Sequence, residues 1–126
     1  MKTEKIYTQH TENTAWMNNV AFYRDEIKVM EGRLREIASR NTSKEVLKQV
    51  EHFQNQFTIQ KERLDELKHE INLSNDSLSK EIGKNPTAAD HRKVKDHAEA
   101  RNEMEGFEKV YAPLKKEFNS FLSEWM

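Results

Sequence analysis

Histidines and carboxylates are the residues of this sequence whose types and spacing could hold a metal ion. Five histidines are present. Glu66 and His69 form a Glu-x-x-His unit, which places both side chains on one face of a helix, as in four-helix bundles that bind two iron ions. Such a site needs the unit twice, together with two further glutamates, and the sequence has no second copy. The spacing therefore does not indicate a di-iron protein.

A site for a single ion remains open on geometric grounds. When the helices inferred below are folded against each other, His69 and His97 fall at the same level of the molecule, and His10 lies within reach of them. With Glu66, these residues are the candidate ligands for a metal or small molecule. The alternative is that they are surface or boundary histidines that flank a narrow apolar stripe, and the sequence favours this interpretation. We expect no cofactor and no resident metal.

Other kinds of catalytic chemistry have less support. The absence of cysteine excludes disulfides, thiolate catalysis and cysteine-based zinc sites. Ser74, Ser77 and Ser79 cluster without a Ser-His-Asp or Gly-x-Ser-x-Gly context. No glycine-rich loop is present to bind a phosphate. We expect a protein that is not an enzyme and has no catalytic residues.

Composition narrows the possible partners and the location. Charged residues make up 34% of the chain, the net charge is −1 and the mean hydropathy is −1.02. Because positive and negative charges are balanced, the sequence predicts no basic surface for a nucleic-acid backbone, and no nucleic-acid partner is expected. The start MKTEKIYTQH has no apolar core of a signal peptide, and no apolar run of membrane-spanning length occurs. We therefore expect no membrane association and a cytoplasmic location.

Apolar residues with alternating spacings of three and four predict three long helices, over about 12–40, 44–82 and 87–125. Residues 1–11 are expected to form an arm. Thr42 and Glu45 resemble a capping box, and Gly83 with Pro86 is a helix stop signal. Pro113 should kink the third helix. The stripes are Trp16, Val20, Tyr23, Ile27, Met30, Leu34, Ile37; then Val46, Val50, Phe53, Phe57, Gln60, Leu64, Leu67, Ile71, Ser74, Leu78; then Met104, Phe107, Tyr111, Leu114, Phe118, Phe121, Trp125.

The connections between these helices are short, so consecutive helices must be antiparallel neighbours. The expected fold is all-α: one domain, residues 1–126, forming an elongated antiparallel three-helix bundle with a short N-terminal arm. In this arrangement Ile6 and Tyr7 of the arm pack near Leu78 and Val94. One end of the bundle is rich in aromatic residues and the other is thinly packed, with Gln60 at the boundary.

Two groups of residues depart from a simple apolar stripe. Gln60 is either a buried amide that fixes the helix register or a recognition group for a partner, and the sequence favours the first reading. A second group of apolar residues lies beside or away from the stripes: Phe22, Val29, Leu47, Ile59, Leu73, Val110 and Leu122. Where such residues are exposed together, they indicate a protein partner or a self-association contact.

The run FYRDEIKVMEGRLREIASRNTS and the run KEVLKQVEHFQNQFTIQKERLDELKHEI, together residues 22–71, resemble a small family of uncharacterised all-helical proteins of Bacteroidota-type bacteria. That family has no established function, so the resemblance implies a helical fold and transfers no site residues. The length and three-helix pattern also resemble a spectrin repeat, which implies architecture alone.

These observations lead to one preferred function and one alternative. The preferred function is a non-enzymatic helical bundle that serves as a protein–protein interaction or structural module, with a protein partner or a second copy of itself. The alternative is a bundle that binds a metal or small ligand through His10, Glu66, His69 and His97.

Overall fold

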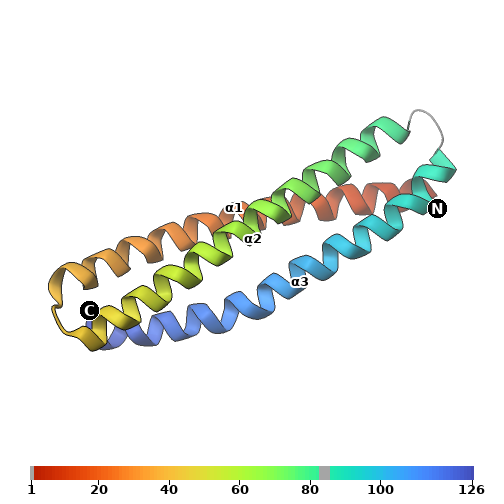
Figure 1. Ribbon diagram of the computed structural model, residues 1–126. Helices are drawn as coiled ribbons and strands as arrows, with labels where there is room; N and C mark the ends of the chain where they lie inside the picture. The colour runs from red at the N-terminus through yellow and green to blue at the C-terminus, as the bar shows by residue number, and fades with distance from the viewer. Residues whose placement is uncertain (1, 83–85) are drawn as a thin grey trace.

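The computed structural model is a rod of three long α-helices joined by two short connections (Figure 1). α1 spans Lys2–Arg40, α2 spans Lys44–Ile82 and α3 spans Pro86–Trp125. The structure describes the backbone of residues 2–82 and 86–126, and the side chains of residues 8–75 and 97–126. α2 runs antiparallel to α1 and α3, and each helix packs against the other two. The chain is therefore an all-α three-helix bundle, as the stripes predict.

The N-terminal segment differs from the sequence prediction. Residues 2–11, expected to form an arm, continue α1 as a helix from Lys2. The physical reason lies in the spacing: Gln9 and Asn13 precede Trp16 and Val20 by seven residues each, so they extend the stripe of α1 with polar side chains. Both are buried. The expected packing of Ile6 and Tyr7 near Leu78 and Val94 lies outside the described side chains.

The ends of the helices show how the chain reverses direction. At the end of α1, the side-chain amide of Asn41 donates a hydrogen bond to the backbone oxygen of Ile37, 2.8 Å away, and so satisfies one terminal carbonyl. At the start of α2, the amide of Leu47 donates to the Ser43 oxygen at 3.0 Å, so Ser43 rather than Thr42 is the first residue to accept a helical bond. The predicted stop at Gly83 lies outside the described residues.

α3 continues through Pro113 without a break in its assignment as one helix. Pro113 is exposed, and it lacks the N–H that would bond to the carbonyl of Lys109. Because this part of α3 faces outward, water can bond to the freed carbonyl. As expected, the helix runs through Pro113, and the kink there stays a prediction.

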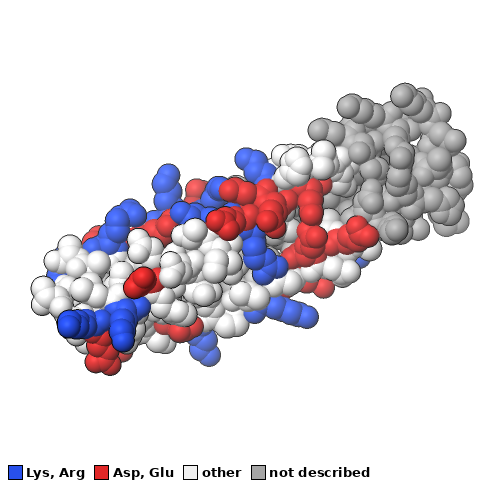
Figure 2. All heavy atoms as spheres, viewed as in Figure 1, with Lys and Arg blue, Asp and Glu red and all other residues white. Residues whose placement is uncertain are grey.

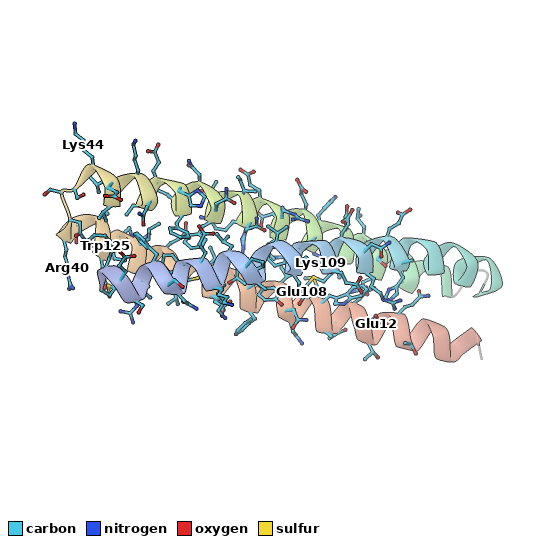
Figure 3. The ribbon with its side chains drawn as sticks, turned by 90° about the horizontal axis from the view of Figure 1, so that it is seen from below. Glu12, Arg40, Lys44, Glu108, Lys109 and Trp125 are labelled. Carbon is cyan, nitrogen blue, oxygen red and sulfur yellow. The ribbon has the colours of Figure 1, made fainter. Side chains whose placement is uncertain are left out.

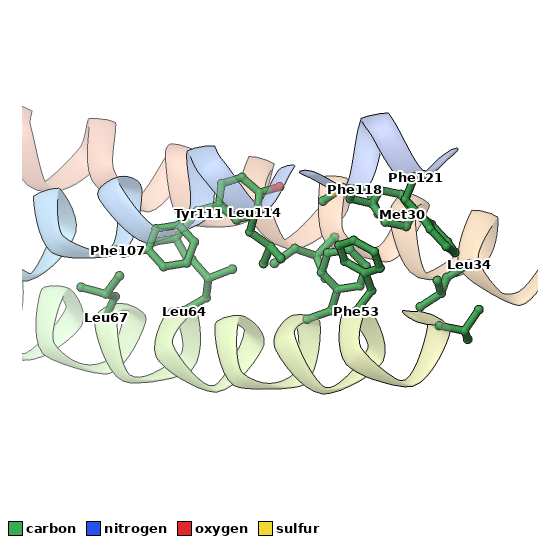
Figure 4. Close-up of a cluster of buried hydrophobic side chains, with 14 of the residues drawn as sticks. Met30, Leu34, Phe53, Leu64, Leu67, Phe107, Tyr111, Leu114, Phe118 and Phe121 are labelled. Carbon is green, nitrogen blue, oxygen red and sulfur yellow. The ribbon is translucent and has the colours of Figure 1, made fainter. Parts of the chain in front are cut away.

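The core is dominated by aromatic rings at the end of the rod where α3 finishes (Figure 4). Phe57, Phe107 and Phe118 are fully buried. The Phe118 ring meets the rings of Phe53 and Phe57 edge-on, with centroids 5.2 and 5.1 Å apart. Such tilted contacts between rings add to the free energy gained by burying apolar surface. Among the described side chains, the buried aromatic rings are therefore concentrated at this end.

Toward the other end, polar residues take over the stripe positions. Gln60 is only 2% exposed, and four further polar residues of the interior are Gln9, Asn13, Ser74 and His97. Burial of Gln60 agrees with the interpretation that it fixes register, because an amide in the core favours the one alignment that can tolerate it. Among the described residues, no helix is long and apolar enough to cross a membrane.

Candidate functional site

The polar residues of the interior gather around His97, which is the best-defined candidate site. His97 is 4% exposed, and its ring stacks on the indole of Trp16 with centroids 4.7 Å apart. Its Nε2 atom lies 3.4 Å from Oε1 of Glu12 on α1. Figure 3 shows Glu12 on α1 at the polar half of the rod, far from the aromatic end at Trp125. A residue of α3 is thus held between two side chains of α1.

Glu12 is fixed in place by a second residue of α3. Nη2 of Arg101 donates to both carboxylate oxygens of Glu12, at 2.8 and 2.9 Å. Desolvation by burial acts to raise the pKa of Glu12, but the hydrogen bonds and charge of Arg101, together with the approach of His97, outweigh it and lower the pKa. Glu12 therefore stays ionised and joins α1 to α3 at this level.

The environment of His97 favours the neutral imidazole. Burial lowers the pKa of His97, and the Arg101 charge lowers it further, while Glu12 acts in the opposite direction. The ring makes no hydrogen bond with satisfactory geometry through either nitrogen, despite the approach of Glu12. A neutral imidazole that stacks on Trp16 acts here as a packing group.

A second polar contact joins α1 to α2 beside this histidine. The side-chain amide of Asn13 donates to Oδ1 of Asn75 at 2.9 Å and to Oγ of Ser74 at 3.3 Å. Asn13 and Gln9 each have a buried side-chain oxygen without a hydrogen-bond partner among the described residues. Such oxygens reduce stability, because the hydrogen bonds to water lost on folding are not replaced. The polar layer, by which we mean the buried residues Gln9, Asn13, Ser74 and His97, therefore aligns the helices but lowers the stability of the bundle.

The four residues singled out as ligand candidates are separated by the structure. His97 is buried, whereas His10, Glu66 and His69 are exposed. Among residues 8–75 and 97–126, no group of three or more His, Asp or Glu side chains is placed to hold a metal ion. His10 and His69 agree with the interpretation as surface or boundary histidines, whereas His97 lies inside the bundle.

A different arrangement of polar groups lies near the middle of the rod and was missed by the sequence analysis. The Tyr23 hydroxyl donates to Glu108 at 2.6 Å, and the Tyr111 hydroxyl donates to Glu26 at 2.5 Å. Lys115 also pairs with Glu26, at 2.6 Å. Burial, followed by the bond to Glu108, raises the pKa of Tyr23 to about 12; burial and Glu26 raise the pKa of Tyr111 further. These phenols stay protonated and act as hydrogen-bond donors that hold α1 against α3.

The outward-facing apolar residues agree with the sequence prediction. Six of the seven off-stripe residues are exposed: Phe22, Val29, Leu47, Ile59, Leu73 and Val110. The seventh, Leu122, is partly buried against the core. The seams of the bundle therefore do not absorb these six side chains.

Comparison of the chain with known protein families, with curated proteins and with solved structures found no match. The structure defines the class of protein as a three-helix bundle. Any function must be argued from the residues of the chain itself.

Proposed function

We propose that this protein is a non-enzymatic interaction or structural module, a helical rod that acts by binding protein through its outer faces. The proposal rests on the pair Phe22 and Val29. Their exposed fractions are 58% and 64%, and they lie one heptad apart, so both project from the same side of α1. Single exposed apolar residues are ordinary, but an aligned pair of large ones on a charged helix is typical of a contact surface.

The interior supports the same proposal. The core beneath α1 is filled by Tyr23, Ile27 and Met30, which belong to the apolar stripe and contact the other helices. Phe22 and Val29 lie outside that core: more than half of each side chain is exposed, and Phe22 meets it only through an edge contact with the Tyr23 ring, 5.8 Å between centroids. The charged neighbours Asp25 and Arg33 keep this face soluble in the absence of a partner.

Site-specific photo-crosslinking in the cells that produce the protein tests this proposal. A photoreactive phenylalanine derivative replaces Phe22 in one variant and Lys28 in the control variant; Lys28 is exposed and, six residues from Phe22, projects from a different side of α1. We expect a discrete crosslinked product from position 22, either with another protein or with a second copy of the chain, and none from position 28. Equal or absent crosslinking at the two positions would contradict the assignment of this face.

Sedimentation equilibrium over a wide concentration range separates the two forms of the proposal. A chain that stays at 15.0 kDa binds a different protein, whereas a stable dimer binds itself. In the second case, Phe22→Ser combined with Val29→Ser should return the dimer to a monomer. A dimer that survives this double substitution would show that Phe22 and Val29 do not form the contact.

A further inference from the structure

A second outward surface lies along the contact between α2 and α3, and it has a regular register. Nε2 of His52 on α2 lies 3.6 Å from Oε1 of Glu117 on α3. Because the two helices are antiparallel, a step of one heptad forward in α2 and one backward in α3 moves in the same direction along the rod. That step brings Ile59 opposite Val110. A second step brings Glu66 to the level of Glu103.

We define the outer seam as the six residues of these three levels: His52, Ile59 and Glu66 on α2, and Glu117, Val110 and Glu103 on α3. All six are exposed. The last level agrees with the electrostatics, since Glu70, one turn beyond Glu66, lies close enough to Glu66 and Glu103 for both to raise its pKa. The outer seam is thus a continuous surface shared by two helices.

The centre of the outer seam is apolar. Ile59 is 47% exposed and Val110 is 45% exposed, at the same level of neighbouring helices. Gly106 lies one turn from Val110 and has no side chain, and its nearest neighbour across the seam is the Arg63 side chain, 3.7 Å from an ideal Cβ position. The surface here is therefore low, with two apolar side chains at its centre and Arg63 beside them, and it can take the apolar face of another helix.

Carboxylates crowd one side of this apolar centre. The hydrogen bond shared with Glu103, followed by partial burial and the charges of Glu103, Glu66 and Glu99, raises the pKa of Glu70 to about 7. Figure 2 shows the acidic side chains gathered over α2 and α3, beside an area of uncharged surface. The repulsion between these carboxylates decreases when a cation binds beside them.

Arg63 lies between the apolar centre and the carboxylates. The Arg63 guanidinium lies over the Phe107 ring, 6.0 Å from its centroid, and Arg63 is half-buried. In the described part of the chain, Arg63 makes no ion pair with Glu66 or Glu103. The negative charge of Glu66 and Glu103 is therefore available to a partner.

We propose that the outer seam binds a basic amphipathic helix of a partner protein, with apolar side chains on Ile59 and Val110 and lysine or arginine side chains against Glu66 and Glu103. This inference rests on the proposed function and names the chemistry of the partner. The occupant is a helix because the seam residues recur every seven positions along both α2 and α3. The i, i+3, i+4, i+7 positions of a helical face recur with the same period. It is basic because the seam supplies the opposite charge.

Selection from a phage-displayed library of helical peptides tests the proposal on the full chain. The peptides are about 20 residues long, roughly 30 Å as a helix, which covers three heptads. Their contact positions are varied among Leu, Lys, Glu and Ser. We expect enrichment of peptides that combine Leu with Lys, and we expect their binding, measured by fluorescence anisotropy, to weaken as salt is raised.

Matched variants locate the binding surface. Ile59→Ser with Val110→Ser should weaken the enriched peptides about tenfold, because the apolar contact at the centre is lost. The control, Phe22→Ser with Val29→Ser, removes similar apolar area from α1 and should leave the affinity unchanged. All four residues are exposed, so circular dichroism should show intact helices in both variants.

The charge contribution is tested with Glu66→Gln combined with Glu103→Gln, which should weaken the peptides and reduce the salt dependence. Enrichment of acidic or uncharged peptides would overturn the proposal. So would a wild-type dimer that the Ile59→Ser and Val110→Ser pair converts to a monomer, because a second copy would then occupy the seam.

Two other outcomes separate this inference from the proposed function. Peptides whose binding depends on Phe22 and Val29, and not on Ile59 and Val110, would overturn the inference and leave the proposed function standing. Failure to enrich any peptide, together with the absence of crosslinks from position 22, would overturn both.

Discussion

Replacement of Gln60 by leucine is the most direct test of how the interior of this bundle is built. Gln60 takes the stripe position between Phe57 and Leu64, both fully buried, and is itself 2% exposed. Its Oε1 atom is buried without a hydrogen-bond partner. A buried polar atom in that state lowers the free energy of unfolding by about 1–3 kcal/mol. Leucine is close to glutamine in size, so Gln60→Leu removes this penalty without leaving a large cavity.

We therefore expect Gln60→Leu to raise the free energy of unfolding by about 1–3 kcal/mol. For a chain of 126 residues, each kcal/mol corresponds to a shift in Tm of about 4 °C. The assay is urea denaturation followed by circular dichroism, with calorimetry for Tm. The control is Gln54→Leu, which makes the same chemical change at an exposed position of α2 and should alter stability by no more than about 0.5 kcal/mol.

The result that would refute this reasoning is a fall in Tm of several degrees for Gln60→Leu. It would show that the amide makes a favourable contact that outweighs its unpaired oxygen. A second measurement concerns specificity: if Gln60 fixes the register, the leucine variant should show a broader range of oligomers in sedimentation velocity than the wild type. A variant that is more stable and strictly monomeric would mean that the amide has no role in register.

Three further predictions concern the core, the polar layer and the helix backbone. Phe118→Ala, which empties a fully buried position, should cost about 3–5 kcal/mol in urea denaturation, and a near-neutral result would mean that the stripe faces outward. Because the pKa of His97 is below its ordinary 6.5, the folded chain takes up fewer protons than the unfolded chain as pH falls below 6.5. The contribution of His97 to stability should therefore fall as pH drops below 6.5, and His97→Gln should remove this fall relative to the wild type; an identical profile in both proteins would argue against a buried neutral imidazole. Gly32→Ala should raise stability by about 1 kcal/mol, because the nearest atom to an added Cβ is Nη2 of Arg35 at 3.8 Å, and a lower Tm would contradict this.

The fold was predictable because its main determinant is a local pattern. The heptad spacing from Val20 to Ile37, and from Met104 to Phe121, marks the buried face wherever apolar residues occupy it. Short connections then allow only antiparallel neighbours. The same heptad spacing explains why an off-stripe residue such as Phe22 is exposed, because its side chain does not point toward a partner helix.

The candidate site was only partly predictable, because hydropathy does not reveal polar residues at buried positions. His97 is seven residues before Met104, and Asn13 is seven before Val20, so the heptad register alone places both in the interior. Counting back along the stripe would have found them. The pairing of Glu12 with Arg101, by contrast, depends on which rotamers of two long side chains meet across helices, and no sequence pattern determines that.

An odd number of antiparallel helices places the start of α1 and the end of α3 at opposite ends of the rod (Figure 1). A pulling force applied to these two ends would act along the helix axes. The three helices would then have to slide past one another, which breaks many packed contacts at once instead of one level at a time. The Glu12–Arg101 and Glu26–Lys115 pairs join the two parallel helices, α1 and α3, at separate levels and would resist such sliding from the first displacement. The geometry of the rod therefore predicts a higher resistance to a force along its axis than to a force that peels one helix away from the other two.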